Sequence, residues 1–106
     1  VIVFARGVGA GHVSIARQVK PNAVGVESGL PLDWARETLV PLCAVQGNLD
    51  PVVLASGGSQ MEASVRRILR ALPRERHVFN LGHGIRQETP AQHLAEVVQL
   101  IRSSND

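Results

Sequence analysis

Residues 42–51 have the sequence LCAVQGNLDP, in which an apolar run passes directly into a glycine and polar residues. An apolar run of this kind, bounded by Gly or Pro, is typical of a strand that is buried on both faces. Three other segments have the same character, at residues 1–5, 23–26 and 77–81. The sequence therefore predicts four short buried strands, and the chain is expected to begin inside the first of them.

Segments with helical character separate these strands. Residues 11–19 and residues 32–39 are the first two candidates, and they end before Pro21 and Pro41. The residue before a proline is disfavoured in helical geometry, so both prolines predict helix ends.

The two later helices carry start signals. Residues 59–62, SQME, have the form of a capping box, and apolar residues then recur at helical spacing up to Leu72. Thr89-Pro90 puts a proline at the first position of the last helix. Strand and helix thus alternate four times, which predicts parallel strands joined by right-handed crossovers. A half barrel and an open doubly wound sheet both fit, and periodicity alone does not choose between them.

The composition argues against several functional classes. The 106 residues suffice for one globular domain. The net charge is only +2, the arginines are dispersed, and Phe4, Trp34 and Phe79 are the only aromatic residues, so nucleic acid is not expected as a partner. No apolar run reaches the roughly 18 residues of a spanning helix, and no signal-peptide pattern is present, so we expect no membrane partner and a cytoplasmic location. Cys43 has no second cysteine to pair with and is expected to be a buried hydrophobe.

Glycine and polar residues gather directly after each predicted strand, at residues 6–11, 27–29, 47–51 and 82–84. In both α/β architectures, ligands bind at the loops that follow the carboxyl ends of the strands, so function is expected there. The first of these loops spaces its glycines as GxGxG and not as the GxGxxG of a dinucleotide-binding loop. A phosphate-binding loop and a tight strand-to-helix turn remain as alternatives for it.

Four histidines are candidates for chemistry. His83 lies between two glycines in a loop, where the backbone can approach a ligand, and it could be functional or structural. His77 precedes its strand, at the end where stability and not chemistry is expected, and is predicted to be a surface residue. His93 is predicted to be solvated on the last helix, and the role of His12, beside the glycine-rich turn, stays open.

Two carboxylates follow predicted strands. Asp50 could contact a ligand, but an Asp-Pro pair that starts a helical turn is a sufficient structural reason for it. Glu27 is the only acid directly at the end of the second strand, and one carboxylate without a partner is not an acid/base pair.

Two strand-end segments match a known family in order and spacing. Residues 45–51, VQGNLDP, and residues 79–85, FNLGHGI, resemble uroporphyrinogen decarboxylase, and residues 23–26 and 33–37 are similar to it as well. The resemblance covers essentially the whole chain and is to the last part of a protein about three times this length. It implies that residues 1–106 are the C-terminal half of a (β/α)8 TIM barrel, with four parallel strands, numbers five to eight, and crossover helices.

The family removes carbon dioxide from the four acetate side chains of uroporphyrinogen III and gives coproporphyrinogen III in haem and chlorophyll synthesis. The resemblance implies a tetrapyrrole substrate, no metal or organic cofactor, and a homodimer of the full-length protein. The catalytic carboxylate and main arginines of the family belong to the N-terminal half, so this chain alone is expected to be inactive. His83 alone carries over, as a substrate-binding residue that hydrogen-bonds a substrate carboxylate.

The chain departs from the family's usual pattern at two loops. Glu27-Ser28 stands where many relatives have Asp-Trp, and residues 5–9, ARGVG, replace the more usual PRGAG. These changes leave the contacts of the pocket rim open.

Two other functions remain as alternatives. A zinc-dependent methyltransferase of the same superfamily needs thiolate and imidazole ligands, whereas Cys43 has no histidine within two positions and no second cysteine. The missing half of the barrel itself supports a non-catalytic binding or regulatory protein. An isolated sector of four strands would leave two unpaired edges and one open apolar face, which predicts association.

Overall fold

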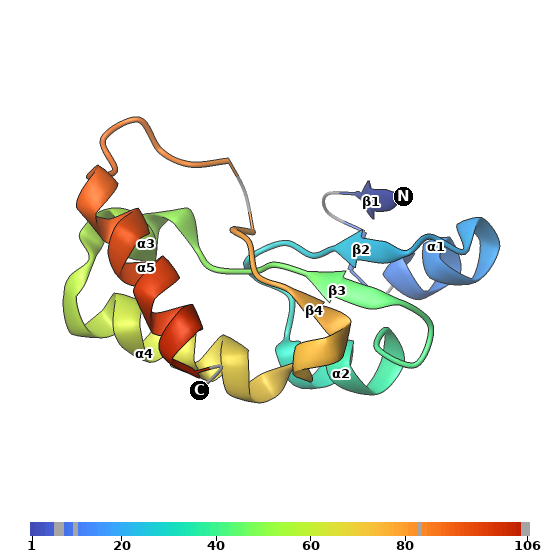
Figure 1. The fold of residues 1–106 in the computed structure, drawn as a ribbon. Coiled ribbons are helices and arrows are strands. Elements are labelled where there is room, and N and C mark those ends of the chain that lie inside the picture. The colour runs from blue at the N-terminus through green and yellow to red at the C-terminus, as the bar shows by residue number, and fades with distance from the viewer. Residues whose placement is uncertain (6–7, 10, 83, 105–106) are drawn as a thin grey trace.

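The computed structural model describes residues 1–5, 8–9, 11–82 and 84–104. Four strands form one sheet, and every neighbouring pair is parallel (Figure 1). The strands are β1 (Ile2–Phe4), β2 (Ala23–Gly25), β3 (Ala44–Gln46) and β4 (His77–Val78). The helices are α1 (Gly11–Val19), α2 (Leu32–Thr38), α3 (Pro51–Ser56), α4 (Gly58–Ala71) and α5 (Ala91–Ser104), with a 3-10 turn, η1 (Arg74–Arg76), before β4.

The order of the strands in the sheet is the order in the chain, β1-β2-β3-β4. Each crossover therefore connects a strand to its immediate neighbour, always on the same side. Right-handed crossovers that all move the same way place their helices on one face of the sheet, as in a barrel, whereas a doubly wound sheet reverses its order at a switch point. The prediction of four parallel strands with crossover helices is confirmed, and the order selects the barrel sector.

The hydrophobic core lies between the sheet and the helices. Val24 and Val45 lie side by side in β2 and β3, and neither is exposed to solvent. Met61, Val65 and Ile68 pack onto this core from α4, at the helical spacing that the sequence predicted. Parallel β-strands with branched side chains under an amphipathic helix give a dry interior of this kind.

The first strand does not have the predicted environment. Ile2 is 52% exposed and Phe4 is 45% exposed, so the prediction of burial on both faces is wrong for β1. The physical reason is position, because β1 is an edge strand with β2 as its only neighbour in this sheet. The last strand is also shorter than predicted, although an isolated bridge between Leu49 and Leu81 continues the pairing beyond it.

The helix starts differ from the predicted ones in detail. The capping box at Ser59 is wrong, because α4 already starts at Gly58 and no side chain caps it. Asp50 instead caps α3, where its side chain accepts a hydrogen bond of 2.9 Å from the Val52 N–H, which confirms the structural interpretation of the Asp-Pro pair. Pro90 directly precedes α5. In the described part of the chain, no helix is both long and apolar enough to cross a membrane.

Candidate functional site

The loops that follow β2, β3 and β4 come together at the carboxyl ends of the strands. The loop after β3 is central, because the Val26 N–H donates to the Gln46 carbonyl at 2.8 Å and the Gly47 N–H donates to the Val78 carbonyl at 3.0 Å. Gly47 has a φ of 141°, and a Cβ at this position would lie 2.7 Å from the Val26 carbonyl oxygen. Glycine is therefore required where the chain turns out of β3.

Asn48 clamps the loop after β2. Its side chain is 5% exposed, and its Nδ2 donates to the carbonyls of Glu27 at 2.9 Å and Leu30 at 3.1 Å. Two loop carbonyls thus share one buried amide group. Buried carbonyls that lose such a donor are costly, so Asn48 fixes the path of residues 27–30.

The loop after β4 is held from the same centre. The Leu49 N–H donates to the Asn80 carbonyl at 3.1 Å, and the Gly82 N–H donates to the Leu49 carbonyl at 2.8 Å. Gly82 also packs against Ser28, since a Cβ on Gly82 would lie 2.6 Å from the Ser28 Cα. The three loops therefore form one packed rim, which we define as residues 27–30, 47–50 and 80–82.

The predicted substrate-binding residue, His83, lies outside the described residues, and so does part of the glycine-rich first loop, at residues 6, 7 and 10. The structure places Gly82, the residue before His83, in the rim. The role of His83 as a substrate ligand stays a prediction.

His12 is the most unusual polar residue near the rim. It has no solvent exposure, and neither Nδ1 nor Nε2 has a hydrogen-bond partner in the described structure. Burial lowers the pKa of His12 below its ordinary value of 6.5, and the charge of Glu27 offsets part of this effect. His12 is therefore held as a neutral imidazole.

His77 and His93 differ from their predictions. His77 is not a surface residue, because it is partly buried and its Nε2 lies 2.8 Å from the Gly47 carbonyl oxygen. Burial lowers the pKa of His77, and the bond to Gly47 raises it in part. His93 is partly buried instead of solvated, and its Nδ1 lies 2.7 Å from the Leu54 carbonyl oxygen. Both rings bridge separate segments and have structural roles.

Cys43 is a buried thiol, 3% exposed, as the sequence predicted. Burial raises the pKa of Cys43, which keeps it protonated. Within residues 1–5, 8–9, 11–82 and 84–104, no group of three His, Cys, Asp or Glu side chains could hold a metal ion.

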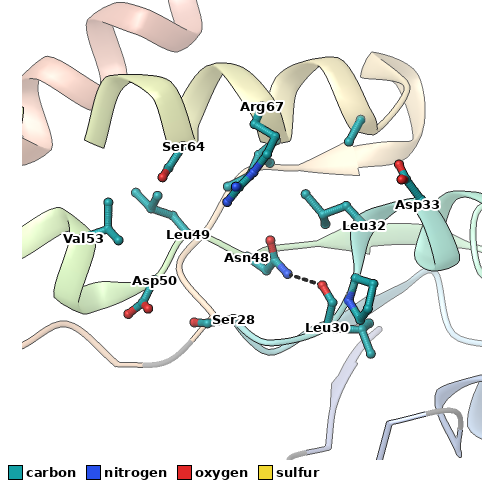
Figure 2. A pocket seen from close by; sticks show the side chains of 13 residues that line it. Ser28, Leu30, Leu32, Asp33, Asn48, Leu49, Asp50, Val53, Ser64 and Arg67 are labelled. Atoms are coloured by element: carbon teal, nitrogen blue, oxygen red, sulfur yellow. Dashed lines mark hydrogen bonds between the residues drawn. The ribbon is translucent and has the colours of Figure 1, made fainter. Parts of the chain in front are cut away.

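A cavity of about 470 Å³ adjoins the rim. Ser28, Asn48 and Asp50 line it from the rim, and Ser64 and Arg67 line it from α4 (Figure 2). Asn48, Ser64 and Arg67 were not among the site residues predicted from the sequence. Only Asn48 had a signal, since it is the one asparagine within the motif VQGNLDP.

Parallel strands in chain order, with polar loops packed at their carboxyl ends, define the chain as a sector of an α/β barrel whose ligands bind at those ends. Comparison with known proteins identifies the family. The uroporphyrinogen decarboxylase family model matches residues 1–104, and the chain belongs to this family. It is therefore a portion of a TIM barrel, as predicted.

Individual relatives agree with the family match. The chain is 43% identical over 103 residues to a uroporphyrinogen decarboxylase from Rhodospirillum rubrum, which covers 97% of this chain and 30% of that protein. It is 42% identical over 102 residues to one from Novosphingobium aromaticivorans, which covers 96% and 30%. It is 35% identical over 105 residues to one from Neorickettsia sennetsu, which covers 99% and 32%. The chain spans about 30% of the length of the curated relatives that it matches.

Proposed function

We propose that this chain supplies strands five to eight of a uroporphyrinogen decarboxylase barrel. The family match over residues 1–104 is the observation that carries the proposal. The ordered parallel strands support it, because a barrel closes when further strands pair with both edges of such a sheet. On this proposal, the complete enzyme removes the carboxyl groups of the four acetate side chains of uroporphyrinogen III in porphyrin and haem synthesis.

The chemistry sets the demands on the site. Loss of carbon dioxide leaves electrons on the acetate methylene carbon, and protonation of the pyrrole lets the ring nitrogen accept those electrons. A carboxylate near the pyrrole nitrogens stabilises the developing cation, and cationic or hydrogen-bonding side chains hold the carboxylates of the substrate. The family needs no metal and no organic cofactor for this reaction.

The role proposed for this chain is to bind and orient the substrate. His83 comes directly after the rim residue Gly82 in the sequence and is proposed to hydrogen-bond a carboxylate of the tetrapyrrole. The catalytic carboxylate and the main arginines are proposed to come from the remaining strands of the barrel. The complete protein is proposed to be a cytoplasmic homodimer.

A chimera tests this function directly. The matched 30% of the Rhodospirillum rubrum relative is replaced with residues 1–106, and decarboxylation of uroporphyrinogen is followed by chromatography of the products. We expect the chimera to form coproporphyrinogen. We expect His83→Asn in the chimera to lower kcat/KM about a hundredfold with little change in Tm, because a loop residue that binds substrate adds little to folding.

His93→Asn is the matched control. The His93 Nδ1–H donates to the Leu54 carbonyl oxygen, so this variant should lower Tm and leave kcat/KM of the folded fraction nearly unchanged. A chimera that folds with the Tm of the parent enzyme but releases no carbon dioxide would favour the non-catalytic alternative. A large loss of Tm in His83→Asn would make His83 a structural residue.

A further inference from the structure

The cavity beside the rim has an apolar floor and a polar mouth. Leu30, Leu49 and Ile68 form much of its floor, and all three are at most 9% exposed. Its volume of about 470 Å³ lies within the range of small-molecule sites in proteins, which is about 300–1,000 Å³. The size suits a ligand with a compact apolar body.

Arg67 brings an unpaired cation to this cavity. Its guanidinium points from α4 toward Asn48 (Figure 2), and in the described part of the chain no ion pair or hydrogen bond is found for it. No carboxylate lies three or four positions from Arg67 along its helix, where the residues are Ala63, Ser64, Arg70 and Ala71. The neighbouring Arg66 differs, since it pairs with Glu62 at 2.9 Å.

Asn48 presents a hydrogen-bond acceptor to the same space. Both carbonyls that its Nδ2 reaches belong to the rim, so its Oδ1 is left to face the cavity, and Figure 2 shows this oxygen directed toward Arg67. The hydroxyl of Ser64 lies one helical turn before Arg67 and lines the same wall. A donor cation, a hydroxyl and an amide oxygen therefore converge on the mouth of an apolar cavity.

The two acids of the lining limit the charge of a ligand. Asp50 is engaged in capping α3, and Asp33 lies in the first turn of α2, away from Arg67 in Figure 2. Their negative charges disfavour a ligand with two or more negative charges. One guanidinium matches one planar carboxylate through paired N–H donors.

We propose that this cavity is a binding site for a small organic monocarboxylate. Arg67 and Ser64 hold the carboxylate, Asn48 accepts a hydrogen bond from the ligand or from a bridging water, and the apolar body lies against Leu49 and Ile68. The site does not depend on the proposed decarboxylase function, because none of these contacts involves His83.

Titration with 3-phenylpropionate tests the site. Saturation-transfer NMR observes the ligand, so it works for the 106-residue chain whether it is monomeric or associated. We expect saturable binding, a loss of affinity of tenfold or more in Arg67→Gln, and a smaller loss in Arg67→Lys, which keeps the charge but not the planar pair of donors. Arg66→Gln, the adjacent cation with its own partner, should change the affinity less than twofold.

Two further probes separate the contributions of charge and apolar body. 3-Phenylpropan-1-ol has the same body without the carboxylate and should bind at least tenfold more weakly, and inorganic phosphate should not compete at equal concentration. The proposal is overturned if 3-phenylpropionate shows no saturable binding, if the alcohol binds equally well, or if Arg66→Gln and Arg67→Gln have equal effects. Circular dichroism of each variant verifies that the exposed substitutions leave the fold intact.

Discussion

Both faces of the sheet carry apolar side chains, but these side chains differ in exposure to solvent. On the helix-covered face, Val24 and Val45 are fully buried. On the other face, Phe4 and Val78 lie in one row across the sheet through Gly25 and Gln46, and each is 45% exposed. Neighbouring residues of a strand point to opposite faces, so one strand contributes to both environments.

This difference in exposure arises because the helices of the chain cover one face of the sheet and leave the other open. Helices that follow right-handed crossovers cover only one face of a sequentially ordered sheet. The open face keeps apolar side chains such as Ile2 and Phe4, which is the pattern of a barrel interior and not of a solvated face. The predicted association of the isolated chain follows from the same face and stays a prediction.

The largest expected effect comes from truncating a valine, and the same substitution on each face of the sheet tests the difference in burial. Val45→Ala should lower the free energy of unfolding by about 2–3 kcal/mol, because it removes two buried methyl groups and leaves a cavity. Val78→Ala, in the adjacent strand but on the open face, should lower it by less than about 0.5 kcal/mol. Urea unfolding followed by circular dichroism measures both.

Equal losses for the two valines would mean that the open face is covered in solution, for example by a second copy of the chain. Light scattering of the same samples distinguishes that case, because a covered face requires an associated species.

A second, smaller effect contrasts two asparagines at the strand ends. Asn48→Asp removes both donors to the Glu27 and Leu30 carbonyls and should cost about 2 kcal/mol. Asn80 uses its Oδ1 to accept from the Leu81 N–H at 2.8 Å, an interaction that aspartate retains. Asn80→Asp should therefore change the free energy of unfolding by less than about 0.5 kcal/mol.

Amide hydrogen exchange adds a local measurement to this comparison. In Asn48→Asp, exchange at Leu30 and Gly82 should accelerate more than exchange in α4. Unchanged protection at Leu30 would show that Asn48 does not hold the rim.

The strands and most helices could be predicted from sequence because local patterns determine them. The apolar run before Gly47 and the Asp50-Pro51 pair both had the predicted structures, since a buried strand and a capped helix start depend on few neighbouring residues. The exposure of β1 could not be predicted in this way. Whether an apolar strand is central or at an edge is decided by its sheet neighbours, which periodicity does not contain.

The site was predictable only in its location. Glycine and polar residues at the carboxyl ends of the strands indicated the rim correctly, because parallel strands bring those ends together. The bonds of Asn48 to Glu27 and Leu30 and the bond of His93 to Leu54 join segments at least 18 residues apart. Arg67 had no signal, since a cation within a basic helix is ordinarily a solvated residue.

The smallest effect concerns His12, the one histidine in the described part of the chain that is buried without a hydrogen-bond partner. His12→Leu keeps a similar volume and removes two unpartnered nitrogens, so it should raise the free energy of unfolding at pH 7 by about 1 kcal/mol. It should also change the dependence of stability on pH. Burial lowers the pKa of His12 in the folded state, so the unfolded state takes up the proton first as the pH falls below 6.5. The contribution of His12 to stability is thus constant above pH 7 and is lost as the pH falls from 6.5 toward the lowered pKa.

Urea unfolding at pH 7 and at pH 5 measures the effect. The loss of stability between these two values should be smaller in His12→Leu than in the parent chain. A remaining loss is expected from His77, whose pKa is also lowered by burial. The charge of Glu27 raises the pKa of His12 and so opposes the effect of burial. Glu27→Gln should therefore enlarge the loss of stability between pH 7 and pH 5 in the parent chain. The same substitution should have less effect in His12→Leu. A His12→Leu variant that is less stable than the parent at pH 7 would instead mean that His12 has a hydrogen-bond partner in solution.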